Sequence, residues 1–141
     1  MNRRHFCATS IAGSLISAIH ASSNNTKKPR ILLRSSWQTI NIGDIAHSPG
    51  LLAILEKLLP EAEVTLWASN VDRGVKEMLL RRFPRLTITT AGGNRRTWNR
   101  IGEIHELFKE IDFFLHGSGP WLVSPRSVEE WIKQTGKPFG V

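Results

Sequence analysis

The sequence contains almost no cysteine: Cys7 is the only one among 141 residues. A single cysteine this close to the N-terminus leaves the rest of the chain without a disulfide framework, a thiol nucleophile or a thiolate metal site. Three internal histidines, His47, His105 and His116, lack the spacing of metal ligands, and no H-E-x-x-H motif occurs. Neither thiol chemistry nor a metal centre is therefore predicted.

Several phosphate and nucleophile motifs are also missing. The sequence has no Walker loop, no G-x-S-x-G nucleophile elbow and no complete G-x-G-x-x-G fingerprint. It shows no internal repeat and no low-complexity tract. With 40% hydrophobic and 22% charged residues, the composition is that of one ordinary globular domain.

The charge is strongly positive, with 19 Lys and Arg residues against 12 Asp and Glu residues and a formal net charge of +7. Such a balance fits nucleic acid, a membrane surface or small anionic substrates. Arg95, Arg96 and Arg100 surround Trp98 and could hold a phosphate, a sugar or a nucleic-acid strand. No recognition motif accompanies them, so we do not predict a nucleic-acid partner. Trp98 fits the apolar face of the following helix, and we expect it in the core.

The first 23 residues have the layout of an export signal. Arg3 and Arg4 precede an apolar stretch from about Ile11 to Ile19, which is too short to span a bilayer. The paired arginines resemble the twin-arginine export motif, which predicts a periplasmic or extracellular protein and no stable membrane span. Removal of the signal lowers the formal charge to +5. Residues 24–29 have the composition of a linker.

From residue 30 onward, short apolar runs alternate with segments of helical periodicity. This order predicts an α/β fold, a Rossmann-like doubly wound parallel sheet. Ser48 is the predicted N-cap of the first helix, with Pro49 in its first turn, and Asp72 that of the second. Ser124 or Ser127 is predicted to cap the last helix, and Gly136 to end it. The predicted strands are 31–33, 63–69, 86–90 and a fourth, within 111–120, that runs into a glycine turn. The predicted helices are 49–59, 72–83, 98–109 and a last one that ends near 135.

The sequence ends in GKPFGV, where a fifth apolar strand begins. Domains of this class usually contain five or six strands. We therefore expect residues 30–141 to be an N-terminal Rossmann-like domain that is incomplete at its C-terminus.

Ligands of open parallel sheets bind beyond the carboxyl ends of the strands. The first of these loops carries Asn41, Gly43 and Asp44, which are either ligand-binding residues or members of a local turn. Asp44 could act as a general base. In the HGSGP turn, the backbone N–H groups of Gly117, Ser118 and Gly119 could hold a phosphate or carboxylate, or the turn is purely structural.

Together these motifs resemble the polysaccharide pyruvyl transferase family. The resemblance rests on the N-x-G-D sequence before a helix (41–44), the apolar strand that runs into a Gly-rich turn (113–120) and the GKPFGV ending. It implies two Rossmann-type domains facing each other, as in glycosyltransferase-B proteins. The implied reaction transfers pyruvyl from phosphoenolpyruvate to sugar hydroxyls as a cyclic ketal. Asp44 would be the base or orienter, with Asn41 and Gly43 lining the site and residues 117–119 holding an anion.

Family members carry a C-terminal domain beyond the region matched here. The resemblance thus predicts a transferase only when a second domain completes the site, with phosphoenolpyruvate as donor substrate and no resident cofactor. One alternative is a non-catalytic module that binds a carbohydrate or phosphorylated ligand on the same scaffold. Another is a truncated reading frame without function.

Overall fold

The computed structural model describes residues 27–117 and 122–141, so the predicted export signal and part of the HGSGP turn lie outside the described residues. Five parallel strands form one sheet in the order β3-β2-β1-β4-β5. This arrangement confirms the predicted parallel α/β, Rossmann-like fold. The strands are β1 (Arg30–Ser35), β2 (Glu63–Ala68), β3 (Thr87–Thr89), β4 (Phe113–His116) and β5 (Phe139–Gly140).

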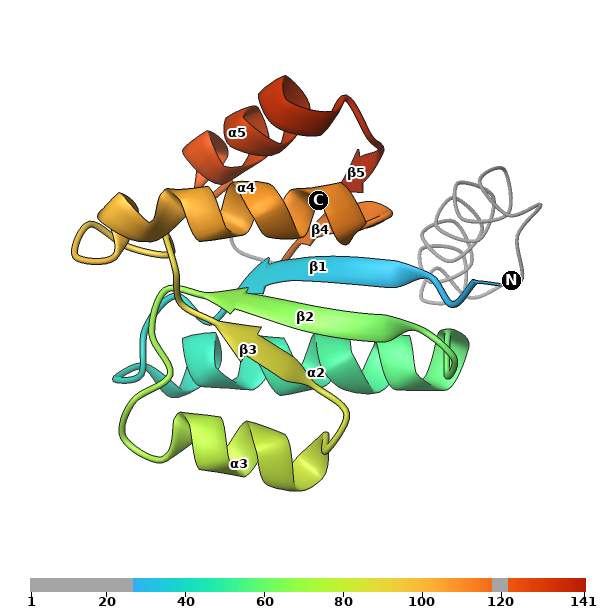
Figure 1. Ribbon diagram of the computed structural model, residues 1–141. Helices are drawn as coiled ribbons and strands as arrows, with labels where there is room; N and C mark the ends of the chain where they lie inside the picture. The colour runs from blue at the N-terminus through green and yellow to red at the C-terminus, as the bar shows by residue number, and fades with distance from the viewer. Residues whose placement is uncertain (1–26, 118–121) are drawn as a thin grey trace, which may run out of the picture.

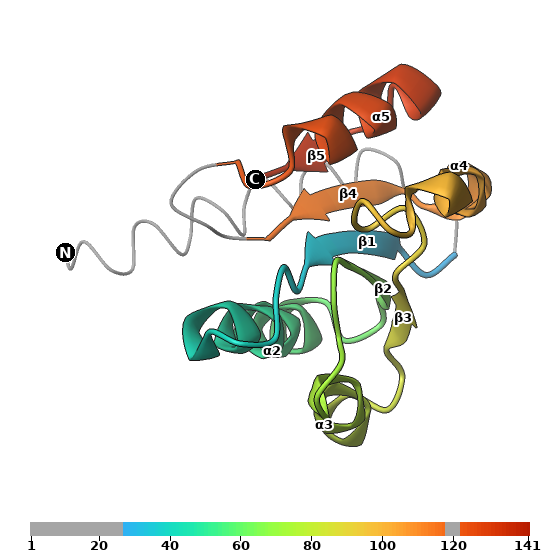
Figure 2. The ribbon, with the colours of Figure 1, turned by 90° about the vertical axis from the view of Figure 1, so that its left-hand side faces the viewer.

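Helices cover both faces of the sheet (Figures 1 and 2). The pair α2 and α3 lies on one face, and the pair α4 and α5 lies on the other. The helices are α2 (Ile42–Leu58), α3 (Val75–Arg82), the 3-10 helix η1 (Trp98–Arg100), α4 (Ile101–Glu110) and α5 (Pro125–Thr135).

The two faces have different cores. Under α2 and α3 the buried side chains are mostly aliphatic, among them Leu33, Leu52 and Leu66. Under α4 and α5 aromatic rings make up much of the buried core. Trp131 stacks on Phe114 with ring centroids 5.6 Å apart and meets Phe108 edge-on at 5.0 Å. Aromatic pairs in these geometries stabilise a core beyond the effect of their buried area.

The predicted start of the first helix is wrong. Helix α2 begins at Ile42, and the side chain of Asn41 caps it by accepting a hydrogen bond from the Gly43 N–H at 2.8 Å. Ser48 is instead buried in the middle of the helix, where its hydroxyl is bonded to those of Ser35, the last residue of β1, and Ser36, the first residue after it. Pro49 therefore lies inside the helix and removes one of its backbone hydrogen bonds.

The second helix also starts later than predicted, at Val75. Gly74 is its N-cap in the left-handed conformation, and the Asp72 carboxylate accepts a hydrogen bond from the Thr39 hydroxyl instead of capping the helix. At the last helix, Ser124 occupies the N-cap position but makes no side-chain cap bond. Gly136 ends that helix at φ +62°, which confirms its predicted role.

The fifth strand predicted from GKPFGV is present, since β5 pairs with β4. Lys137, just before it, connects α5 to the end of α4. Its ammonium donates to the carbonyls of Phe108, Lys109 and Ile111 at 3.0, 3.0 and 2.6 Å, while its own carbonyl accepts from the Trp131 indole N–H. A cation at a helix C-terminus also interacts favourably with the helix dipole.

We predict that Lys137→Met destabilises the fold by about 1–2 kcal/mol, because it leaves three carbonyls without their charged donor. Urea unfolding followed by far-UV circular dichroism measures the effect. Lys133→Met is the matched control, since Lys133 lies on the exposed side of α5. Equal unfolding midpoints for the two variants would contradict the prediction.

Candidate functional site

The carboxyl ends of the strands lie along one edge of the sheet, which faces the viewer in Figure 2. The chain order reverses between β1 and β4: the loop after β1 leads to α2 on one face, and the loop after β4 leads to α5 on the other. Ligands of open α/β sheets bind at this reversal. The candidate site is therefore the end of β1 and β4, from Arg34 and His116 onward.

Sheet register places three large side chains in one row at this edge. Arg34 pairs with Trp67 of β2 on one side and with His116 of β4 on the other. Partners in a parallel sheet point to the same face, here the face covered by α4 and α5. The row puts a guanidinium between an indole and an imidazole.

Arg34 is only 2% exposed, and none of its hydrogen-bond partners among the described residues is a carboxylate. It donates to the Trp67 carbonyl at 2.9 Å, the Gly93 carbonyl at 2.8 Å and the hydroxyls of Ser69 and Ser127 at 2.9 and 3.1 Å. Its guanidinium also lies 4.8 Å from the centre of the Trp67 ring. Burial lowers the pKa of Arg34 to about 9, so the group stays charged at neutral pH.

Trp37 and His116 form the second part of the edge. Their ring centroids are 5.1 Å apart, and the Arg34 guanidinium lies 4.5 Å from the centre of the Trp37 ring. The Trp37 Nε1 and the His116 Nε2 are buried, and neither has a hydrogen-bond partner among the described residues. Buried polar atoms are normally satisfied, so a donor and a ring nitrogen left without partners at a sheet edge indicate a place for a polar ligand.

The loop after β1 is strained at Ser36, a non-glycine residue with φ +59°. Its carbonyl accepts hydrogen bonds from the N–H groups of Ser69 and Asn70, and its hydroxyl is bonded to that of Ser48 at 2.8 Å. Ser35 makes a second 2.8 Å bond to Ser48. These buried contacts hold the left-handed turn in place, and the turn directs the chain toward Trp37.

The predicted Asn-Gly-Asp residues lie together on the first turn of α2. The Asn41 side chain is occupied by its cap bond to Gly43, as the local-turn alternative requires. Asp44 is half-buried and accepts a hydrogen bond from the Gln38 amide. Ile42, between them, is 77% exposed, so this turn faces solvent.

The glycine turn after β4 is described only as far as Gly117. The Gly117 N–H donates to the Arg34 carbonyl at 2.7 Å, so this N–H extends the β1–β4 pairing and does not fit the prediction that it holds an anion. A Cβ at this position would come within 2.8 Å of the Ser35 side chain, which explains the need for glycine. Ser118 and Gly119 lie outside the described residues, and their anion-binding role stays a prediction.

The expectation that Trp98 lies in the core is wrong. Trp98 belongs to the short 3-10 helix η1 and is half-buried. Its ring is covered by the Arg126 guanidinium, 3.8 Å from the ring centre. Trp98 precedes α4 and is not part of the helical repeat that continues with Ile101 and Ile104.

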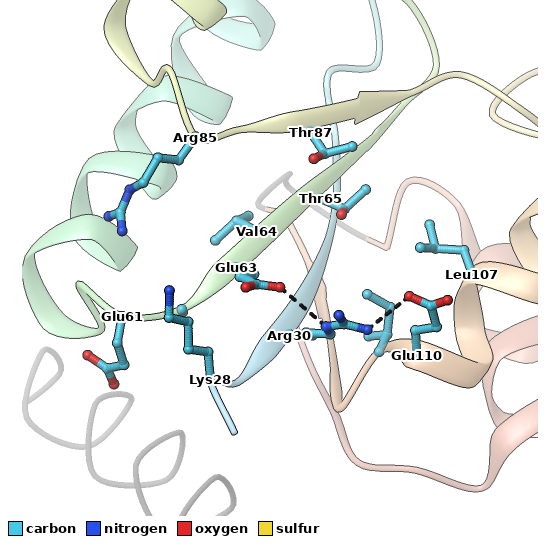
Figure 3. A pocket seen from close by; sticks show the side chains of 12 residues that line it. Lys28, Arg30, Glu61, Glu63, Val64, Thr65, Arg85, Thr87, Leu107 and Glu110 are labelled. Atoms are coloured by element: carbon cyan, nitrogen blue, oxygen red, sulfur yellow. Dashed lines mark hydrogen bonds and ion pairs between the residues drawn. The ribbon is translucent and has the colours of Figure 1, made fainter. Parts of the chain in front are cut away.

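A second pocket, of about 450 Å³, lies at the opposite, amino end of the sheet (Figure 3). Arg30 pairs there with Glu63 at 3.3 Å and with Glu110 at 2.9 Å. The charged lining of this pocket is balanced, so it offers no net charge to a ligand. Three basic and three acidic side chains line it: Lys28, Arg30, Arg85, Glu61, Glu63 and Glu110.

Within residues 27–117 and 122–141, no three His, Cys, Asp or Glu side chains are grouped to hold a metal ion. His105 pairs with Glu130 across α4 and α5 at 3.0 Å. In the same part of the chain, no helix combines the length and the apolar character needed to cross a bilayer.

Comparison of the chain with protein-family models, with curated proteins and with solved structures finds no match. The candidate site is therefore supported by its own geometry alone. Sequence reasoning missed Arg34 and Trp37, because a charged residue within an apolar run and an aromatic residue just after it have no motif. The one signal that could have pointed to this region is Arg34 itself, since an arginine is rarely buried in the interior of a strand.

We predict that His116 makes the stability of the fold depend on pH. Burial lowers the pKa of His116 below its usual 6.5, the charge of Arg34 adds to this, and a backbone hydrogen bond at Gly117 partly opposes it. The unfolded state therefore binds the proton first, and stability falls as the pH drops below about 6.5. Urea unfolding at pH 7.5 and pH 5.5 should show a smaller difference for His116→Phe than for the parent chain.

His47→Asn is the control, because His47 is exposed on α2. This variant should keep the pH dependence of the parent. An unchanged pH dependence in His116→Phe would show that another group is responsible.

Proposed function

We propose that the carboxyl edge of this sheet binds a sugar, as the acceptor-binding half of a polysaccharide pyruvyl transferase-like protein. The observation that carries the proposal is the Trp37–His116 pair at the reversal of strand order, which combines an aromatic ring with two buried ring nitrogens that have no partner among the described residues. Sugars combine apolar C–H faces with hydroxyl groups. An indole with a free N–H beside an imidazole complements both.

The position of Asp44 supports a catalytic role in the proposed reaction. It lies on the first turn of α2, the helix that follows β1, and Gln38 holds its carboxylate from one side. A carboxylate in this position can accept the proton of a sugar hydroxyl as that hydroxyl attacks. The donor would be phosphoenolpyruvate, and the product a cyclic ketal on the sugar with release of phosphate.

Two exposed isoleucines flank this edge and fit an arrangement in which a second domain faces it. Ile40 and Ile42 are each 77% exposed, in the loop before α2 and at its start. Neighbouring apolar side chains exposed in this way could pack against a second domain. In this proposal the second domain supplies the groups that bind the donor.

The same pair favours one alternative, a sugar-binding module without catalysis. Both candidates require sugar binding at Trp37 and His116. They differ in phosphoenolpyruvate, which only the transferase consumes. Release of inorganic phosphate from phosphoenolpyruvate, dependent on an added sugar, would distinguish them.

We predict that Trp37→Phe weakens sugar binding about tenfold, because phenylalanine keeps an aromatic ring but lacks the N–H donor. Saturation-transfer NMR with methyl glucoside, methyl galactoside and methyl mannoside measures the affinity. Trp98→Phe is the matched control, since it removes an indole N–H from η1, where the ring contacts Arg126. No saturation transfer from the parent chain to any of these sugars or to their oligosaccharides would overturn the proposal.

Asp44→Asn separates binding from catalysis. In the form completed by a second domain, this variant should keep sugar affinity and lose at least about 100-fold in turnover, the usual effect of removing a general base. Turnover within a factor of two of the parent would assign Asp44 a structural role only.

A further inference from the structure

A separate pocket of about 420 Å³ opens beside Arg34. It is formed by the loop after β3, the helix η1 and the start of α5. We call it the basic pocket; its lining residues are Arg34, Gly92, Gly93, Asn94, Arg95, Trp98, Ser124 and Arg126. This volume lies within the range of small-molecule sites.

The charge of the basic pocket is unbalanced. Arg34, Arg95 and Arg126 line it, and no Asp or Glu side chain does. None of the three forms an ion pair within the described part of the chain. In the pocket at the amino end of the sheet, by contrast, basic and acidic side chains are equal in number. Three cations around one cavity without a counter-charge favour an anionic ligand.

Arg34 supplies a fixed donor at the inner wall. A guanidinium has five N–H groups, and four of those of Arg34 are used in its bonds to Ser69, Gly93, Ser127 and the Trp67 carbonyl. Among the described residues, Nη1 makes only the bond to Trp67, so within this part of the chain one of its two N–H groups is left to donate. Burying a charge is costly unless it is compensated, and a bound anion would compensate this one.

The start of α5 adds positive potential to the same cavity. Ser124 and Arg126 line the pocket from this first turn, which has neither a side-chain cap nor an acidic residue. The Ser124 hydroxyl is bonded to that of Ser127, which in turn accepts from Arg34. Helix N-termini attract anions through their free N–H groups and the helix dipole.

Arg126 is held in place over Trp98, with its guanidinium 3.8 Å from the ring centre. Stacking fixes the plane of the guanidinium while leaving its N–H edge free for a ligand. The indole also gives the pocket an apolar wall. The lining therefore combines three arginines for an anionic group with an aromatic surface for the organic part of the ligand.

We propose that the basic pocket binds a small molecule through its phosphate group. Phosphate, with two negative charges and several acceptor oxygens, matches three arginines better than a singly charged carboxylate does. This site is distinct from the sugar-binding edge at Trp37 and His116, and it does not depend on that proposal. The two sites have one residue in common, Arg34.

Isothermal titration of the full chain with inorganic phosphate and with phenyl phosphate tests this inference. We expect both to bind and phenyl phosphate to bind more tightly, because its ring can contact Trp98. Arg95→Gln and Arg126→Gln should each weaken binding about tenfold, the effect of losing one charge-assisted hydrogen bond. Both residues are exposed, and far-UV circular dichroism checks that the variants fold.

Arg96→Gln is the matched control, because it removes the same charge next to Arg95 but does not line the pocket. It should leave phosphate affinity within a factor of two. Equal weakening by all three substitutions would show attraction by net charge alone and overturn the proposal. The proposal would also be overturned if neither phosphate compound bound. This includes the case in which a single-stranded oligonucleotide binds and the two phosphate compounds do not.

Discussion

The buried guanidinium of Arg34 is the interaction on which the carboxyl edge of this protein depends. It lies in the middle strand of the sheet and joins segments that are far apart in the chain: the end of β2, the loop after β3 and the first turn of α5. Each bond ends on a neutral oxygen. A charge buried in this way is expensive, and the fold keeps it where two candidate binding regions meet.

The sheet register turns this single residue into an organised surface. Because the strands are parallel and in register, Trp67, Arg34 and His116 form one row on the face covered by α4 and α5. Trp37 then returns over the row, after the strained turn at Ser36. The result is an edge whose polar groups are positioned by β-strand pairing and buried serine contacts, both of which are rigid compared with surface loops.

The class of fold was predictable from the sequence, because it follows from the periodicity of the apolar residues and from the order of the predicted strands and helices. Apolar runs separated by helical segments identify a parallel sheet, and Gly136 ends its helix as its type suggests. Helix starts were harder to predict. Ser48 and Asp72 are good caps by type, but tertiary contacts use their side chains elsewhere, and Asn41 caps α2 in place of Ser48.

The site was predictable only in part. The edge where it lies follows from the fold, and Asn41, Gly43 and Asp44 are indeed neighbours there. Arg34, Trp37 and Arg126 could not be assigned, because their roles depend on strand register and on the packing of α5 against the loop after β3. The placement of Trp98 failed for a related reason, since a helical period does not reveal that the first turn is a 3-10 helix.

The division of the core into an aliphatic and an aromatic face affects how the protein can be observed. In the described part of the chain, the tryptophans belong to the α4 and α5 side, at positions 37, 67, 98 and 131. The emission of these four tryptophans therefore reports on one layer of the molecule. It would not respond directly to loosening of α2 and α3, and a simple transition in their emission would describe only half of the unfolding reaction.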